Sequence, residues 1–295
     1  MVEGDRRSTH QAGLAFGPVA FAECADPVLP PGEGPDRDRT VSAQPAFVPI
    51  NDRLPAFGEM IKEDIRIRSS EGPDFNCYLA VPEAEETVPA VVLASAITGV
   101  DEDHRRIADE FTSNGYITAV PDLFWRTVPG GLVRGDPRAA LRGQPRLEKI
   151  KAGECDLVDV LAMLRKQPSF NGRAAVMGFC FGGPYAILGP KRLGYSAGIS
   201  CHGSRMGDFV EELAGVHLPV CLIWGDQDHA APAAVLEAFR AVPARMKSVE
   251  VHVLPGQRHG YMMQSNTDAF DKDAYQFSVK CALRILQRLR TAAAS

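Results

Sequence analysis

One hexapeptide near the middle of the chain, Gly-Phe-Cys-Phe-Gly-Gly at 178–183, limits the fold more than any other segment. The apolar run at 173–177 predicts a buried strand, and residues 184–188 predict the first turns of a helix that begins with proline. A strand that turns at once into a helix strains its central residue and leaves no room for side chains two positions to either side. Glycines occupy both positions, so we interpret the segment as a nucleophile elbow centred on Cys180.

The helix predicted beneath Cys180 would favour its thiolate, because a helix N-terminus carries partial positive charge. The hexapeptide alone leaves an alternative, which is an ordinary buried cysteine in a glycine-rich turn.

The composition is that of a globular protein, with 295 residues, 45% hydrophobic and 23% charged. A net charge of −5 gives no indication of a nucleic-acid surface, and no apolar run approaches the ~20 residues that span a bilayer. The seven cysteines are scattered and form no Cys-x-x-Cys pair. We therefore expect thiols in a reducing, cytoplasmic environment rather than a disulfide framework.

Residues 1–58 hold eight of the 22 prolines and show no regular hydrophobic period. We predict an irregular N-terminal extension there, with a proline- and glycine-rich linker at 30–35. Its apolar stretch at 12–22 leaves an export signal as an alternative. Residues 59–295 form the predicted domain.

The domain begins with two alternating segments, 61–69 and 75–81, which predict an antiparallel pair. Apolar runs then alternate with amphipathic ones, which is typical of βαβ units. The further predicted strands are 88–95, 116–121, 174–177, 195–201, 218–224 and 248–254, and the predicted helices are 102–114, 147–167, 231–242 and 268–290. Eight mostly parallel strands with Cys180 after the fifth predict an α/β class protein with the α/β-hydrolase fold.

A cysteine nucleophile requires a base, and the base requires an orienting acid. In this fold the acid and the histidine follow the nucleophile in that order, after later strands. Asp228 follows the seventh predicted strand and His259 follows the eighth, so Cys180, Asp228 and His259 form the candidate triad. Asp226 remains an alternative acid, although Asp228 lies deeper in its loop.

The remaining histidines are weaker candidates. His202 follows the sixth strand and either lines the pocket or satisfies a backbone group, whereas His229 is interpreted as a neighbour of the base. We expect structural or solvent roles for His104, His217 and His252. Metal ligands at short sequence spacing are absent, so we predict neither a metal nor a cofactor.

An oxyanion hole needs two backbone N–H groups directed at the developing charge. We expect one from Phe181, directly after the nucleophile, and the other from Ile97 in the loop after the third strand.

On these residues the chain, from about residue 61 onward, resembles the dienelactone hydrolase (carboxymethylenebutenolidase) family. The resemblance rests on the elbow together with Gly-Asp-Gln-Asp-His at 225–229 and Gly-Gln-Arg-His-Gly at 256–260. Gly-Tyr at 115–116 and Pro-Asp-Leu-Phe-Trp-Arg at 121–126 add to it. The resemblance implies a Cys-Asp-His triad, supports Asp228 as its acid, and implies hydrolysis of a lactone or activated ester without a cofactor.

Two positions differ from the family pattern. Ala96 stands where the resemblance implies a glutamate that assists thiolate formation, and Met263 stands where it implies an arginine for the substrate carboxylate. A second such arginine corresponds to Arg138 or Arg142. We therefore expect a less charged or bulkier ester than a dienelactone. The expected substrate-binding residues are Ala96, Trp125, Arg138, His202, Tyr261 and Met263.

The sequence thus predicts a hydrolase that forms a thioester with a small-molecule ester or lactone, acting as a monomer or homodimer without nucleic-acid or membrane partners. Two alternatives remain, namely a non-catalytic small-molecule-binding protein with this fold and an acyltransferase or thioesterase.

Overall fold

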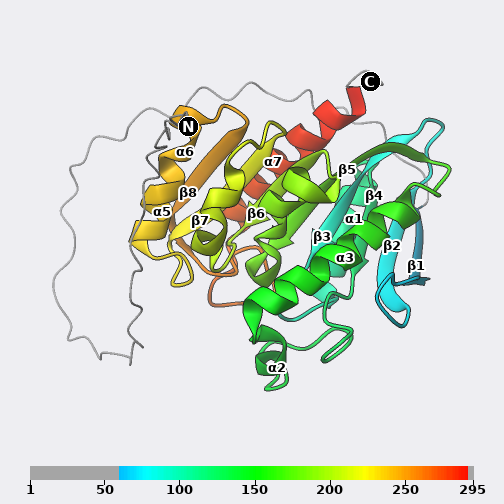
Figure 1. Ribbon diagram of the computed structural model, residues 1–295, viewed down its shortest axis with the longest axis horizontal. Coiled ribbons are helices and arrows are strands. Elements are labelled where there is room, and N and C mark those ends of the chain that lie inside the picture. The colour runs from blue at the N-terminus through cyan, green and yellow to red at the C-terminus, as the bar shows by residue number, and fades with distance from the viewer. Residues whose placement is uncertain (1–59, 292–295) are drawn as a thin grey trace, which may run out of the picture. The chain divides into compact units, whose positions relative to one another are not determined.

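The computed structural model of the protein describes residues 60–291, in which eight strands form one sheet (Figure 1). The predicted N-terminal extension, with its linker and the alternative of an export signal, lies outside the described residues. The strands are β1 (Met60–Ile67), β2 (Phe75–Pro82), β3 (Val88–Ala94), β4 (Ile117–Pro121), β5 (Phe170–Phe179), β6 (Ala197–Cys201), β7 (Val220–Gln227) and β8 (Val249–Arg258).

The sheet has the strand order β1-β2-β4-β3-β5-β6-β7-β8. β2 runs antiparallel to both of its neighbours, β1 and β4, and the other neighbouring pairs are parallel. This confirms the predicted mostly parallel sheet. Because parallel strands share a direction, the carboxyl ends of β3, β5, β6, β7 and β8 meet along one edge.

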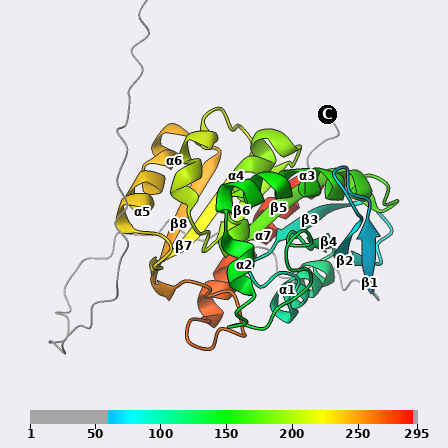
Figure 2. The ribbon, with the colours of Figure 1, turned by 60° about the horizontal axis from the view of Figure 1, so that its bottom comes forward.

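Helices cover both faces of the sheet, and Figures 1 and 2 show α1 and α3 on opposite sides of it. α1 (Glu102–Ser113) and α7 (Lys272–Thr291) pack on one face, whereas α3 (Arg146–Leu164), α4 (Tyr185–Leu188) and α5 (Ala233–Arg240) pack on the other. The shorter elements are α2 (Ala139–Gly143), α6 (Val242–Arg245), two 3-10 segments (Cys180–Gly182 and Met206–Leu213) and a π-helical turn (Gly189–Leu193).

The central strand β3 shows how the core is built. Ala90 and Val92 face the α3 side, Val91 and Leu93 face the α1 side, and all four are fully buried. A fully buried valine or leucine contributes roughly 1.5–3 kcal/mol, more than the roughly 0.5–1.5 kcal/mol net from one hydrogen bond. Burial on both faces is therefore a major contribution to the stability of this strand.

Several helix bounds differ from the sequence prediction. α7 begins at Lys272 rather than at 268, because the Asp271 carboxylate accepts the backbone N–H of Ala274 and the Asp271 N–H bonds to the carbonyl of Tyr261. The helix predicted over 231–242 begins after Pro232 as α5, and the separate turn α6 follows it. The short helix α2 was missed. Within 60–291 no helix combines the length and the apolar character needed to cross a membrane.

Candidate active site

Cys180 occupies the turn between β5 and α4 with a φ of +48°, in the left-handed region that is unfavourable for a residue with a side chain. A Cβ atom on Gly178 would lie 2.1 Å from the carbonyl oxygen of Gly182. One on Gly182 would lie 2.1 Å from the carbonyl oxygen of Ala94. The turn therefore has the geometry of the predicted elbow and requires glycine at both positions.

An aspartate and a histidine pair at the ends of β7 and β8. The Nδ1–H of His259 donates to the Asp228 carboxylate, with Nδ1 lying 2.8 Å from Oδ1 and 3.0 Å from Oδ2. The Asp228 side chain is fully buried and also accepts the N–H of Ala230. Asp226 is exposed and accepts the backbone N–H of Gly256 instead. The geometry thus gives His259 an orienting partner in Asp228 rather than in Asp226.

The surroundings of Cys180 favour a thiolate. Burial raises the pKa of the thiol, but the His259 imidazole, the Ser204 hydroxyl and the Arg146 guanidinium together lower that pKa below its usual value. Burial likewise lowers the pKa of His259, whereas Asp228 and Cys180 raise it, to about 10 overall. The two shifts both favour a thiolate–imidazolium pair over a neutral thiol–imidazole pair.

Two neighbours of Cys180 were missed by the sequence reasoning. The Oγ of Ser204 lies 3.8 Å from the Cys180 Sγ, and the Ser204 N–H donates to the Cys180 carbonyl. Arg146, the first residue of α3, donates to the carbonyls of Phe181 and Ser204, with its guanidinium 4.4 Å from the centre of the Phe181 ring. Ser204 could have been found because it follows β6. No local signal distinguishes Arg146 from other helical arginines.

Side chains fix the loop that carries Ile97, the predicted oxyanion donor. The Ala96 N–H donates to Nε2 of His104 over 3.1 Å, and the His104 Nδ1–H therefore points at the Asp101 carboxylate, 2.6 Å away. Arg142 donates to the Ile97 carbonyl. His104 thus has a structural role, because it ties the loop after β3 at Ala96 to Asp101 at the start of α1.

His202 lies beneath the candidate base with a φ of +43°. Its ring centre is 5.2 Å from that of His259 and 5.4 Å from that of Tyr261. Both ring nitrogens are buried, and neither has a hydrogen-bond partner of good geometry among the described residues. Lining of the pocket and a backbone-satisfying role both remain predictions for His202. Burial holds the pKa of His202 well below its usual range, which keeps the ring neutral beside His259.

The other predicted substrate-binding residues are dispersed. Tyr261 and Met263 are buried in the core beneath α7, where the Tyr261 hydroxyl lies 2.9 Å from the Ser278 Oγ. Trp125 stacks on Phe75 and donates to Asp156. These contacts leave a substrate role for the three residues as a prediction from sequence.

The two arginines left open by the sequence differ in the structure. Arg142 is buried and donates to the carbonyls of Ile97, Val128 and Gly130, so its donors are already occupied. Arg138 is exposed and pairs with Asp136. Of the two, Arg138 is the one that solvent or a ligand can reach.

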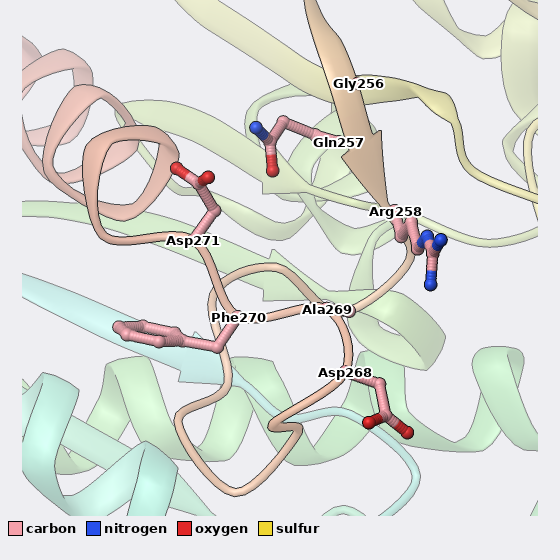
Figure 3. A pocket seen from close by; sticks show the side chains of 7 residues that line it. All are labelled: Gly256, Gln257, Arg258, Asp268, Ala269, Phe270 and Asp271. Atoms are coloured by element: carbon pink, nitrogen blue, oxygen red, sulfur yellow. The ribbon is translucent and has the colours of Figure 1, made fainter.

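Two hollows lie near the loops at this edge. One of about 170 Å³ lies between the end of β8 and the loop before α7, where the Phe270 side chain points away from Arg258 (Figure 3). The other, of about 630 Å³, borders the start of α1, and its lining includes Val100, Asp101 and Leu132. Cys180, Asp228 and His259 line neither hollow. Asp101 connects the larger one to the network that fixes the Ile97 loop.

A doubly covered sheet of this order, with a strained elbow after its fifth strand, defines an α/β-hydrolase fold. Residues 75–289, more than half of the chain, match the Dienelactone hydrolase family. The protein therefore belongs to that family and is a dienelactone hydrolase-like hydrolase.

Relatives and solved structures agree with this assignment. The chain is 27% identical over 217 residues to a carboxymethylenebutenolidase of Pseudomonas putida, covering 70% of this chain and 89% of that protein. It is 25% identical over 236 residues to carboxymethylenebutenolidase 1 of Cupriavidus pinatubonensis, covering 78% and 99%. The crystal structure of a putative dienelactone hydrolase from Klebsiella pneumoniae matches with a TM-score of 0.66 at 20% identity, covering 78% of this chain and 100% of that one. That last likeness supports the fold alone.

Proposed function

We propose that this protein hydrolyses a carboxylic ester or lactone through a triad of Cys180, His259 and Asp228. The observation that carries the proposal is the buried Asp228 carboxylate bonded to His259 Nδ1, which directs the other ring nitrogen away from the acid. The lowered pKa of Cys180 and the raised pKa of His259 support it.

The reaction divides into two acyl transfers. The Cys180 thiolate attacks the carbonyl carbon, and the N–H groups of Phe181 and Ile97 stabilise the resulting oxyanion, each contributing roughly 3 kcal/mol if well aligned. The C–O bond then breaks, and the leaving oxygen takes the proton of the His259 imidazolium. Neutral His259 next accepts a proton from water, which attacks the thioester, breaks the C–S bond and restores the thiolate.

The substrate follows from what surrounds the thiolate. Ala96 stands where the family resemblance implies a glutamate, so its side chain supplies no carboxylate to the thiol. Its backbone N–H donates to His104. We infer that Arg146 and Ser204 replace part of that assistance by stabilising the thiolate before substrate binds. Without an arginine at Met263 the site suits a small-molecule ester or lactone that is less charged or bulkier than a dienelactone.

The first experiment replaces the sulfur. Cys180→Ala should abolish turnover of p-nitrophenyl acetate, and acid-quenched wild type should carry an acetyl group on the peptide containing Cys180. Cys155→Ala is the matched control and should retain turnover, because Cys155 is a half-buried thiol of α3 that donates a hydrogen bond to Glu71. Turnover retained by Cys180→Ala would refute the triad.

Alkylation separates hydrolysis from the non-catalytic alternative. An activated thiolate reacts with iodoacetamide quickly and with little dependence on pH, whereas labelling no faster than that of a free thiol favours the binding protein. Transfer of the acetyl group to an added alcohol or thiol in preference to water would favour the acyltransferase alternative.

A further inference from the structure

Three side chains that commonly bind metals meet away from the candidate active site. Cys221 belongs to β7, His252 to β8 and Cys281 to α7. The two Sγ atoms and a ring nitrogen of His252 all lie within 4.8 Å of one another. These residues are far apart in the sequence, which is why short spacing gave no indication of them.

This cluster is distant from the triad although it uses the same two strands. Cys221 and His252 each stand seven residues before Asp228 and His259, respectively. At about 3.3 Å per residue along a strand, that separation is roughly 20 Å. The cluster therefore lies toward the amino ends of β7 and β8, whereas the candidate active site lies at their carboxyl ends.

The donor atoms are available and largely shielded from water. Cys221 and Cys281 are buried free thiols. The Nε2 atom of His252 is buried and makes no hydrogen bond with any described residue, although the rest of its side chain is part-exposed. Its polar neighbour, the Glu250 carboxylate, is 3.5 Å away, which is too far for a strong hydrogen bond, and a bound ion would satisfy the nitrogen better. The exposed part of the imidazole gives an ion a route from solvent.

Charges around the cluster suit a divalent cation. The Glu250 Oε2 lies 3.5 Å from His252 Nε2, and Arg284 holds the same carboxylate at 2.5 and 2.6 Å. Two thiolates, this carboxylate, the guanidinium and one divalent ion sum to zero charge. Cysteine sulfur with imidazole nitrogen is a donor set typical of Zn²⁺, whose ~2.3 Å Zn–S and ~2.0 Å Zn–N bonds place tetrahedral ligands under about 4 Å apart. The cluster needs only small side-chain shifts to reach that geometry.

We propose that Cys221, His252 and Cys281 bind one Zn²⁺ ion, with Glu250 or water as the fourth ligand. The ion fastens α7 to β7 and β8 and is structural, because it lies far from Cys180. Binding displaces one proton from each thiol and forms two Zn–S bonds and one Zn–N bond. The site is independent of the proposed hydrolysis.

Cobalt provides the direct test, because Co²⁺ bound by thiolates gives an intense charge-transfer band and a tetrahedral visible spectrum. Reduced, metal-free full-length protein is titrated with Co²⁺ and then with Zn²⁺. We expect one equivalent of Co²⁺ to give both features and Zn²⁺ to remove them. Cys281→Ser and His252→Gln should weaken binding by at least about 100-fold, beyond the 10–100-fold typical of an outer-shell partner.

Two controls locate the ion. Cys180→Ala removes the other thiol–imidazole pair and should leave the cobalt spectrum unchanged while it abolishes esterase turnover. Cys77→Ser replaces a buried thiol of β2 remote from the cluster and should also bind normally. Circular dichroism checks that each variant folds. If Cys281→Ser does not fold, His252→Gln still tests the site, because residue 252 is part-exposed and its replacement disturbs the core less.

A thermal readout supplements the spectra. Zn²⁺ should raise the Tm of wild type and Cys180→Ala by mass action, but not that of the cluster variants. Absence of a thiolate-to-cobalt band, its loss in Cys180→Ala, or a Cys221–Cys281 disulfide in the protein as purified would each overturn the proposal.

Discussion

Replacing Asp228 by Asn tests the reasoning on which the candidate triad depends. The pKa of His259 is raised from 6.5 to about 10 with only 15% of its side chain exposed, which corresponds to a preference for the imidazolium on the order of 5 kcal/mol. Asp228 and Cys180 both contribute to that preference, and the hydrogen bond that His259 donates to Asp228 is the largest contribution that raises the pKa. Loss of one opposite charge typically shifts a pKa by about 1–3 units.

We therefore expect Asp228→Asn to reduce the ratio of ion pair to neutral pair by about 10- to 1000-fold. The Cys180 thiolate loses its cationic partner, so its alkylation should shift to higher pH. Esterase kcat should fall by roughly 10³–10⁴-fold, because an asparagine amide can also hold the imidazole in the wrong tautomer.

The assay is the rate of iodoacetamide labelling of each cysteine as a function of pH, followed peptide by peptide. In the wild type, Cys180 labelling should be nearly flat from neutral pH until His259 deprotonates near pH 10. Cys155 is the internal control, because the hydrogen bond to Glu71, together with burial, raises its pKa to about 11 and its labelling should climb steeply with pH.

Two results would refute this account. One is an Asp228→Asn profile that superimposes on that of the wild type. The other is wild-type Cys180 labelling that follows an ordinary thiol of pKa near 9.0.

Three further predictions concern the surroundings of the site. Arg146→Met removes a guanidinium that favours the Cys180 thiolate and should raise the pH of half-maximal Cys180 alkylation by about one unit. Arg240→Met, at an exposed position on α5, is the control and should leave that pH unchanged. Equal profiles for the two variants would contradict the role of Arg146. Gly178→Ala places a methyl group 2.1 Å from the Gly182 oxygen and should lower the free energy of unfolding in urea by about 3 kcal/mol. Gly143→Ala, whose methyl meets Ile97 at 3.5 Å, is its control, and similar midpoints for the two would be evidence against the elbow. Burial opposes ionisation of Asp101, but its hydrogen bonds with the side chain and backbone of His104 lower its pKa from 3.8 to about 2. Its carboxylate therefore contributes about 2 kcal/mol to stability above pH 4, and this contribution is lost as the pH falls toward 2. The stability difference between wild type and Asp101→Asn should narrow over that acid range, and a constant difference would show that the charge is unimportant.

The fold could be predicted largely from local patterns. Buried parallel strands appear as continuous apolar runs. Glycine at 178 is required by a backbone contact of 2.1 Å within the turn itself, whereas the contact that requires glycine at 182 is with Ala94 of the neighbouring strand β3. Element bounds were less predictable. The start of α7 depends on where the Asp271 side chain finds the N–H of Ala274, and periodicity carries no information about such a bond.

The candidate site could be predicted where position along a strand determines position in space. Cys180, Asp228 and His259 each follow a strand of the same parallel sheet, and the sequence places them at one edge. Arg142 shows the limit of that reasoning, because the sequence offered it for a substrate carboxylate while the structure commits its donors to three loop carbonyls.

The sequence by itself determined the sheet, the elbow and the order of the candidate nucleophile, acid and base, because these depend on residue type and on spacing along one strand or turn. Tertiary structure decided that His259 pairs with Asp228 rather than Asp226 and that Ser204 lies against Cys180. It also decided that Arg146 binds the Phe181 carbonyl next to Cys180 and that Cys221, His252 and Cys281 meet. Each of these contacts joins residues from different elements. Their distances are fixed by packing between strands and helices, which the chain acquires only when it folds.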